Sequence, residues 1–160
     1  MTSSARNRMY LAIIAALLVV IAAMAYNFIV AGSTEKGEDG RVAVVLEPGE
    51  RALMLSEMRD FVAGLQALSD GLARDDMKAV AEAARRMGTA RTHDVPAAMM
   101  GKLPLGFKSV AFGVHRDFDT IAADAEAGGS PKHTLAQLSD ALRQCVACHA
   151  AYQVTSAPAH

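Results

Sequence analysis

The sequence contains no tryptophan, and aromatic residues occupy only 5% of its 160 positions. Strand-favouring residues are sparse outside the N-terminal run, so the composition favours helices. The chain has only two cysteines, three positions apart, which is not the framework of a disulfide-stabilised domain. The net charge of −1 gives no reason to expect a nucleic acid as a partner. No phosphate-binding loop is visible.

A long apolar run lies near the N-terminus. Residues 11–30 contain one strongly polar member, Asn27. A helix of this length spans about 30 Å, the thickness of the hydrocarbon core of a bilayer. Arg6 and Arg8 precede the run and acidic residues follow it, so the N-terminus is expected to stay in the cytoplasm while the remainder is exported.

We therefore predict a cytoplasmic N-terminus at residues 1–9 and a transmembrane signal-anchor at residues 10–30. The protein would cross a bacterial inner membrane once, with its main domain in the periplasm. The alternative is a signal peptide cleaved at the Ala-Met-Ala sequence of residues 23–25, which would leave a soluble periplasmic protein. The anchor is favoured because the apolar run continues beyond that site.

The segment after the apolar run changes character twice. Residues 31–40 are small, polar and glycine-rich, which is typical of a linker. Residues 41–46 are mostly apolar and are expected to lie against the domain as an extended arm. We therefore assign residues 31–47 to a linker and arm, residues 48–154 to the main domain, and residues 155–160 to a tail.

Four helical patterns fill the main domain. The first begins at Pro48, the second after Asp75 or Asp76, the third at Pro104 and the fourth at Ser130 and Pro131. The links between the first and second helices and between the third and fourth are short, so these neighbours are expected to be antiparallel. The predicted fold class is all-α: an antiparallel up-down-up-down four-helix bundle preceded by one N-terminal transmembrane helix.

Both cysteines fall in the segment QCVACHAAY near the C-terminus, where Cys145, Cys148 and His149 form a Cys-x-x-Cys-His motif. The apolar stripe predicted for the fourth helix is Leu135, Leu138, Leu142, Cys145, His149 and Tyr152. Cys-x-x-Cys-His is the attachment signature of c-type haem. Each thiol adds to one haem vinyl group, and the histidine ligates the iron. The sequence thus predicts one covalent haem c with His149 as its proximal ligand.

Three other interpretations of the motif fit the sequence less well. A zinc site needs four ligands, and only three are present here. A thioredoxin-like pair lies at a helix N-terminus after a strand, whereas this pair lies in the last turns of a helix. Two buried free cysteines beside a capping histidine would be a structural alternative, and a haem stain would separate it from the haem interpretation.

Over residues 48–154 the chain resembles the cytochrome c prime family. The resemblance rests on the segment CVACHAAY, on its place at the end of the fourth helix and on a methionine-bearing first helix. The resemblance implies a four-helix bundle with haem near the C-terminal end and His149 as the proximal ligand. In some members a methionine of the first helix fills the sixth iron position. Family members usually carry a Lys within the motif and an Arg just after the aromatic residue, and these positions hold Val146 and Gln153 here. If Met58 is the sixth-site residue, Met54 replaces the Arg usually found one turn before it.

Met58 is the predicted sixth ligand, because the apolar positions that follow it match the family's spacing, and Met54 is the alternative. A methionine on a helical stripe is otherwise ordinary core packing. His115 is expected at the rim of the site, where it would be solvated or would bond a haem propionate. The predicted haem pocket comprises Met54, Met58, Phe61, Leu142 and Tyr152.

The function expected is single-electron transfer by a membrane-anchored cytochrome, with no enzymatic activity. The alternative is a five-coordinate haem protein that binds nitric oxide or carbon monoxide. Peroxidase-like catalysis has little support, since no distal acid–base pair can be assigned. The expected partners are the membrane, through the N-terminal helix, and a redox protein. Bundles of this type often dimerise through their first two helices, and Arg85, Arg86 and Arg91 leave a homodimer open.

Overall fold

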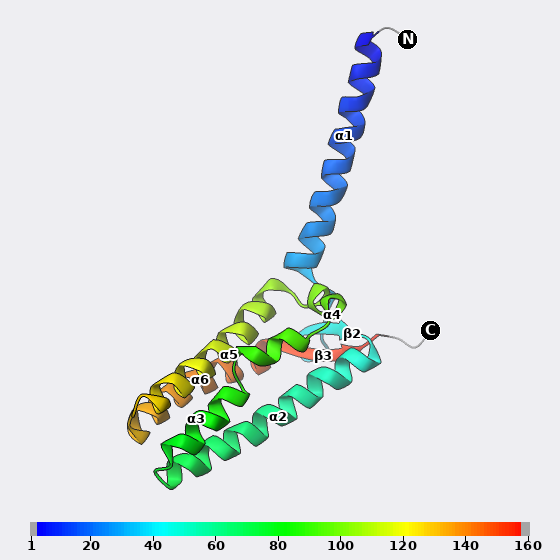
Figure 1. Ribbon diagram of the computed structural model, residues 1–160. Coiled ribbons are helices and arrows are strands. Elements are labelled where there is room, and N and C mark those ends of the chain that lie inside the picture. Colours follow the sequence, from blue (N-terminus) through cyan, green and yellow to red (C-terminus); the bar gives the residue numbers. More distant parts are fainter. Residues whose placement is uncertain (1–2, 158–160) are drawn as a thin grey trace.

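The computed structural model describes residues 3–157 of the chain. The protein is mostly helical (77%), with six helices, the first of them apolar, and a small three-stranded mixed sheet (Figure 1). The expected helical character is confirmed. The sheet is an addition that the all-α expectation did not contain.

Helix α1 (Ser3–Tyr26) projects away from the rest of the molecule and continues into a π-helical turn, η1 (Asn27–Ala31) (Figure 1). Its apolar span, Arg6–Ala31, has a mean hydropathy of 2.6 and none of it is buried. The span is long and apolar enough to cross a membrane, and a signal sequence shares these properties.

Four helices make up the body of the domain: α2 (Pro48–Ala73), α3 (Met77–Arg86), α5 (Leu105–Glu126) and α6 (Pro131–Ala151). Helix α3 packs against both α2 and α5, and α6 packs against α5. The predicted start of α6 is confirmed, because the Ser130 hydroxyl accepts a hydrogen bond from the His133 N–H. Between α3 and α5 the chain forms a 3-10 helix, η2 (Thr89–Asp94), and a short helix, α4 (Ala97–Lys102).

The main core lies where α3 meets its neighbours. Its fully buried side chains include Leu68 of α2, Val80 of α3 and Phe118 of α5. Helix α3 contributes three buried alanines, Ala81, Ala83 and Ala84. Such small side chains let the backbones on either side approach closely, which explains how a ten-residue helix can fill the space between two long ones.

Helix α6 is rotated relative to the stripe predicted for it. Its buried residues are Thr134, Leu138 and Ala141, whereas Leu135 and Leu142 are 58% and 38% exposed. Polar bonds to α5 accompany this rotation: Gln137 donates to Asp124 at 2.5 Å, and Gln144 donates to Asp117. These amides direct one side of α6 towards α5, so the apolar residues on its opposite side remain uncovered.

The sheet joins the segment before α2 to the segment after α6. Its strands are β1 (Thr34–Lys36), β2 (Val42–Leu46) and β3 (Tyr152–Ser156), in the order β1-β2-β3. Strand β1 is antiparallel to β2, and β2 is parallel to β3. The segment before α2 therefore lies beside the segment that follows α6. Helix α6 ends at Ala151, so Tyr152 belongs to β3 and not to the helix.

A second hydrophobic cluster, which we call the strand-end core, forms beside the sheet. It consists of buried Val44, Leu46, Met54, Met99, Leu103 and Phe107. The two strand residues come from β2, and the others come from α2, α4, the residue after α4, and α5. The start of α2 and the start of α5 thus meet at this end of the domain.

His115 lies in the interior and not at the rim. It is only 6% exposed, and its Nδ1 lies 2.7 Å from the carbonyl oxygen of Met87. The Phe61 ring packs against it with the ring centroids 5.2 Å apart. The expectation of a solvated or propionate-binding His115 is therefore wrong, because the ring is enclosed between α2 and the end of α3 and already has a polar partner.

Phe118→Ala is expected to lower the free energy of unfolding by about 3–5 kcal/mol, because it removes a fully buried ring from the main core and leaves a cavity. Denaturant unfolding of the full chain in detergent would measure this. Leu135→Ala, at an exposed position, is the control and should change the value by less than about 0.5 kcal/mol. Equal effects of the two substitutions would contradict the core described above.

Candidate haem-attachment site

The Cys-x-x-Cys-His motif occupies the last turns of α6, just before the chain enters β3. Cys145 and Cys148 are free thiols of intermediate exposure. Cys145 packs against the main core, whereas Cys148 packs against the strand-end core. One turn of α6 therefore carries both thiols on the side of the helix that faces the interior, one on each cluster.

The structure brings four predicted site residues to the strand-end core. Met54 is 9% exposed and belongs to the cluster itself, while Met58, Cys148 and Tyr152 pack against it. The Tyr152 ring meets Phe107 edge-on, with the ring centroids 5.4 Å apart. Methionines of α2 and a cysteine of α6 thus contact one cluster, although about ninety residues separate them in the sequence.

Phe61 lies elsewhere. It packs against the main core, as Cys145 does, and its ring contacts both His115 and Phe118, at centroid distances of 5.2 and 5.8 Å. Phe61 therefore lies one turn deeper along α2 than Met58, in the direction of the main core.

His149 and Leu142 are on the exposed side of α6. Leu142, Val146 and His149 follow one another at helical spacing, and Val146 is 70% exposed. We call these three residues the open stripe of α6. No hydrogen bond links the His149 imidazole to any part of the chain that the structure describes. An apolar stripe that ends in an unpaired imidazole is unusual for a solvated helix face, which is normally polar.

Helix α2 does not cover the open stripe. The α2 and α6 backbones are not close neighbours, in contrast to α2 with α3 and α5 with α6. On α2, Val62 is 67% exposed. The residues present fit a haem, because thiols for its vinyl groups, an imidazole for its iron and uncovered apolar side chains for its faces occur together.

The thiols do not resemble a reactive dithiol. Burial raises the pKa of both Cys145 and Cys148, and the neighbouring Cys145 raises that of Cys148 further. Redox-active cysteine pairs depend on a lowered pKa, usually at a helix N-terminus.

Among the described residues, no group of three or more His, Cys, Asp or Glu side chains is placed to hold a metal ion.

Arg41 holds the C-terminal end of α6. Its Nη1 donates to the carbonyl oxygens of His149, at 3.2 Å, and Tyr152, at 3.3 Å. Its Nη2 donates to Gln153 Oε1 at 3.3 Å, and its Nε donates to Asp39 at 2.7 Å. The last carbonyls of a helix lack partners within the helix, so a guanidinium at this position satisfies them and complements the helix dipole.

Sequence reasoning missed Arg41, because 108 positions separate it from His149. The one indirect signal for an arginine here is Gln153, which stands where the cytochrome c prime family usually carries an arginine. In the structure, Gln153 accepts a hydrogen bond from Arg41, so an arginine does reach this end of α6 from the strand side.

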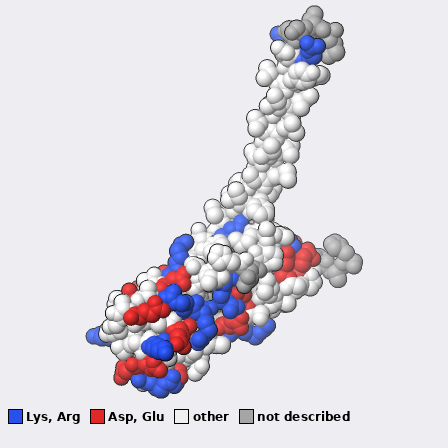
Figure 2. Space-filling model, viewed as in Figure 1, with Lys and Arg blue, Asp and Glu red and all other residues white. Residues whose placement is uncertain are grey.

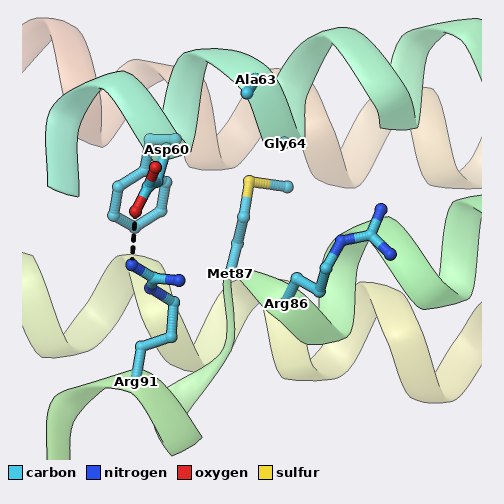
Figure 3. A pocket seen from close by; sticks show the side chains of 7 residues that line it. Asp60, Ala63, Gly64, Arg86, Met87 and Arg91 are labelled. Atoms are coloured by element: carbon cyan, nitrogen blue, oxygen red, sulfur yellow. Dashed lines mark hydrogen bonds and ion pairs between the residues drawn. The ribbon is translucent and has the colours of Figure 1, made fainter. Parts of the chain in front are cut away.

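A cavity of about 300 Å³ lies between α2 and α3, away from the motif (Figure 3). It is lined by Asp60, Phe61, Ala63, Gly64, Arg86, Met87 and Arg91. Arg91 crosses its mouth to donate to Asp60 at 2.6 Å and to Glu57 at 3.2 Å. A neighbouring cavity of about 210 Å³ also borders Arg91. Neither cavity is lined by Cys145, Cys148 or His149. The candidate site is therefore defined by the chemistry of the motif and not by a cavity.

Comparison of the chain with protein-family models, curated proteins and solved structures found no match.

Arg41→Ala is expected to loosen the end of α6, because the carbonyls of His149 and Tyr152 would lose their donor. Amide hydrogen exchange across residues 149–156 should accelerate, and the free energy of unfolding should fall by about 1–2 kcal/mol. Arg51→Ala is the control, since no side-chain hydrogen bond of Arg51 occurs among the described residues. Unchanged exchange in Arg41→Ala would show that β3 alone holds this end.

Proposed function

We propose that this chain is a c-type cytochrome anchored in a bacterial inner membrane, with one covalent haem in the periplasm, and that it passes single electrons. The observation that carries the proposal is the Cys-x-x-Cys-His motif at the end of α6, with its thiols against the interior and its imidazole in the uncovered open stripe. The predicted export and the predicted haem support each other, because c-type haem is attached outside the cytoplasmic membrane.

Each residue of the site has a proposed role. Cys145 and Cys148 would each hold the haem through a thioether, and His149 would ligate its iron from one side. When bound, the haem would supply one-electron oxidation and reduction. The chain's part is to hold and orient the group, and the open stripe of α6 would help to exclude water from it.

Met58 is the proposed sixth ligand and Met54 the alternative. Both belong to or contact the strand-end core, as Cys148 does, and Met58 is the more accessible of the two. Methionine opposite histidine raises the reduction potential and leaves no open iron position, which suits an electron carrier better than a gas-binding protein. The contact of Met58 with the cluster at Cys148 favours the closed site.

The finer fold assignment belongs to the same proposal. We interpret α2, α3, α5 and α6 as an antiparallel up-down-up-down four-helix bundle that resembles the cytochrome c prime family. The packing of α3 on α2 and α5, and of α6 on α5, supports this order, although α2 and α6 are not close neighbours, so the bundle is open between them. The three-stranded sheet and the Arg41 contacts at the end of α6 distinguish this chain from a plain bundle.

The mature protein is expected to carry the mass of one haem on its C-terminal tryptic peptide. That peptide begins at Gln144 and carries both cysteines, because trypsin cleaves after Arg143 and residues 144–160 contain no Lys or Arg. Mass spectrometry of the exported protein checks this, and the double substitution Cys145→Ser and Cys148→Ser should abolish the added mass. An unmodified wild-type peptide from cells that mature other c-type cytochromes would overturn the proposal.

The reduced wild-type protein is expected to give a low-spin optical spectrum that carbon monoxide does not change. Met58→Leu keeps an apolar side chain of similar volume but removes the sulfur ligand, so its spectrum should become high-spin and shift with carbon monoxide. Met54→Leu is the matched control one turn earlier and should behave as wild type.

Two outcomes of this measurement have different meanings. If all three proteins remain low-spin, a residue other than Met58 or Met54 holds the sixth position, whereas a high-spin spectrum of Met54→Leu alone would assign that position to Met54. If the wild type is already high-spin and shifts with carbon monoxide, the five-coordinate gas-binding function replaces electron transfer.

A further inference from the structure

The chain enters the domain from α1 without a flexible connection. The composition of residues 31–40 predicts a linker, yet the Ser33 N–H donates to the Lys102 carbonyl at 2.7 Å, and the Val45 N–H donates to the Ser33 carbonyl at 2.8 Å. Gly32 has φ = 67° and fits so closely that a Cβ there would lie 2.5 Å from the Lys102 oxygen. The first residues after the apolar span are therefore held by α4 and β2.

The end of the apolar span is also held. The Phe28 ring lies against Gly101 of α4, where any Cβ would collide with it. Lys108 of α5 donates from its Nζ to the carbonyl oxygens of Phe28 and Ile29, at 2.8 and 3.2 Å. The same ammonium lies 5.7 Å from the centroid of the Phe28 ring. Lys108 thus supplies the donors that the last carbonyls of a helix lack.

Helix α4 is tied in turn to the start of α2. Lys102 donates to Glu50 at 2.7 Å and to Glu47 at 3.3 Å. The hydrogen bond to Glu50 is the main cause that raises the pKa of Lys102. Burial pulls the pKa of Glu50 upward, but the bonds from Lys102 and from the Glu47 N–H outweigh it and lower the pKa overall. The ion pair therefore stays charged at neutral pH.

These contacts set which face of the domain meets the bilayer. The apolar span reaches Ala31, so η1 lies at the membrane boundary if α1 is inserted. The elements that pack on η1 are α4 and the first turns of α5, and they must lie at the same level. The exposed residues of α4, its N-cap and the first turn of α5 are Pro96, Ala97, Ala98, Leu105 and Gly106, none of which is charged. We call these five residues the basal face.

The charge distribution agrees with this placement. On the side of the molecule shown in Figure 2, much of the surface next to the base of α1 is uncharged, although a basic side chain lies at the base itself and acidic side chains gather to one side of it. Leu105, the largest side chain of the basal face, is 46% exposed. An uncharged surface with a protruding leucine suits the boundary between headgroups and acyl chains.

We propose that the basal face rests on the lipid bilayer and fixes the orientation of the domain on the membrane. This inference rests on the proposed retention of α1 as an anchor and is independent of the haem. The amines of Lys102 and Lys108 are already engaged within the protein, so the contact is apolar and needs no anionic lipid. The strand-end core, with Cys148 against it, is part of the same end of the domain, so the motif is held close to the membrane surface.

The absence of tryptophan from the chain allows a direct test. The full-length protein is reconstituted in phosphatidylcholine vesicles as three separate variants, Leu105→Trp, Leu135→Trp and Ile21→Trp. Each replaced residue is exposed: Leu105 on the basal face, Leu135 in the first turns of α6, and Ile21 within the apolar span. The measurement is the ratio of fluorescence in ordinary and brominated phosphatidylcholine, in which any quenching within the protein cancels.

We expect bromine to quench Ile21→Trp and Leu105→Trp strongly and to leave Leu135→Trp almost unchanged. Quenching of Ile21→Trp without quenching of Leu105→Trp would overturn the proposed contact while leaving the anchor intact. Lack of quenching in Ile21→Trp would instead overturn the anchor on which the inference rests. Loss of haem from any variant would be detected separately by its absorbance.

A second measurement needs no substitution. Wild-type protein in vesicles that contain a photoactivatable diazirine phosphatidylcholine should acquire lipid adducts on residues 96–106 and on the apolar span. Residues 131–142 should remain unlabelled. Equal labelling of residues 96–106 and 131–142 would contradict a fixed orientation.

Discussion

The pairing of β2 with β3 is the constraint on which the candidate site depends. It joins residues 42–46 to residues 152–156 in parallel register, so the chain before α2 is bonded to the chain after α6. Val44 and Leu46 on β2 are fully buried, which anchors the strand in the strand-end core. The last turn of α6, which carries Cys148 and His149, therefore cannot fray freely. Arg41, just before β2, is brought within reach of the carbonyls of that turn by the same pairing.

The domain has two hydrophobic clusters with different roles. The main core holds α2, α3 and α5 together through buried side chains such as Leu68, Val80 and Phe118. The strand-end core gathers the starts of α2 and α5, the sheet and one thiol. Apolar burial stabilises both by about 25 cal/mol per Å² of surface removed from water. The open stripe of α6 lies outside both clusters, so its side chains remain free to contact the proposed haem.

The proposed haem site and the proposed membrane contact meet at one end of the molecule. Leu103 and Phe107 belong to the strand-end core, and they flank the start of α5, whose Lys108 binds the end of the apolar span. The end of the apolar span is held to the domain by hydrogen bonds from Lys108 and by the Phe28 ring against Gly101, so the orientation of α1 would fix that of the domain. In this arrangement the membrane would limit the directions from which a redox partner can approach, which is a geometric consequence of the two proposals together.

Local chemistry determined what could be predicted from the sequence. The start of α6 follows from Ser130 and Pro131, the apolar helix from a long run without charge, and the candidate ligands from the spacing of Cys145, Cys148 and His149. Each of these signals lies within a few neighbouring residues. The haem itself and the electron-transfer function remain predictions.

Only the tertiary structure decided the rest. The sheet depends on pairing across more than a hundred residues, the rotation of α6 on amide bonds to α5, and the burial of His115 on the packing of α2 against the end of α3. The seating of the apolar helix depends on Gly101 and Lys108, which no short-range pattern connects to Phe28. Contacts between distant segments are selected by which surfaces the folded chain buries together, and a single sequence carries no local signal for that choice.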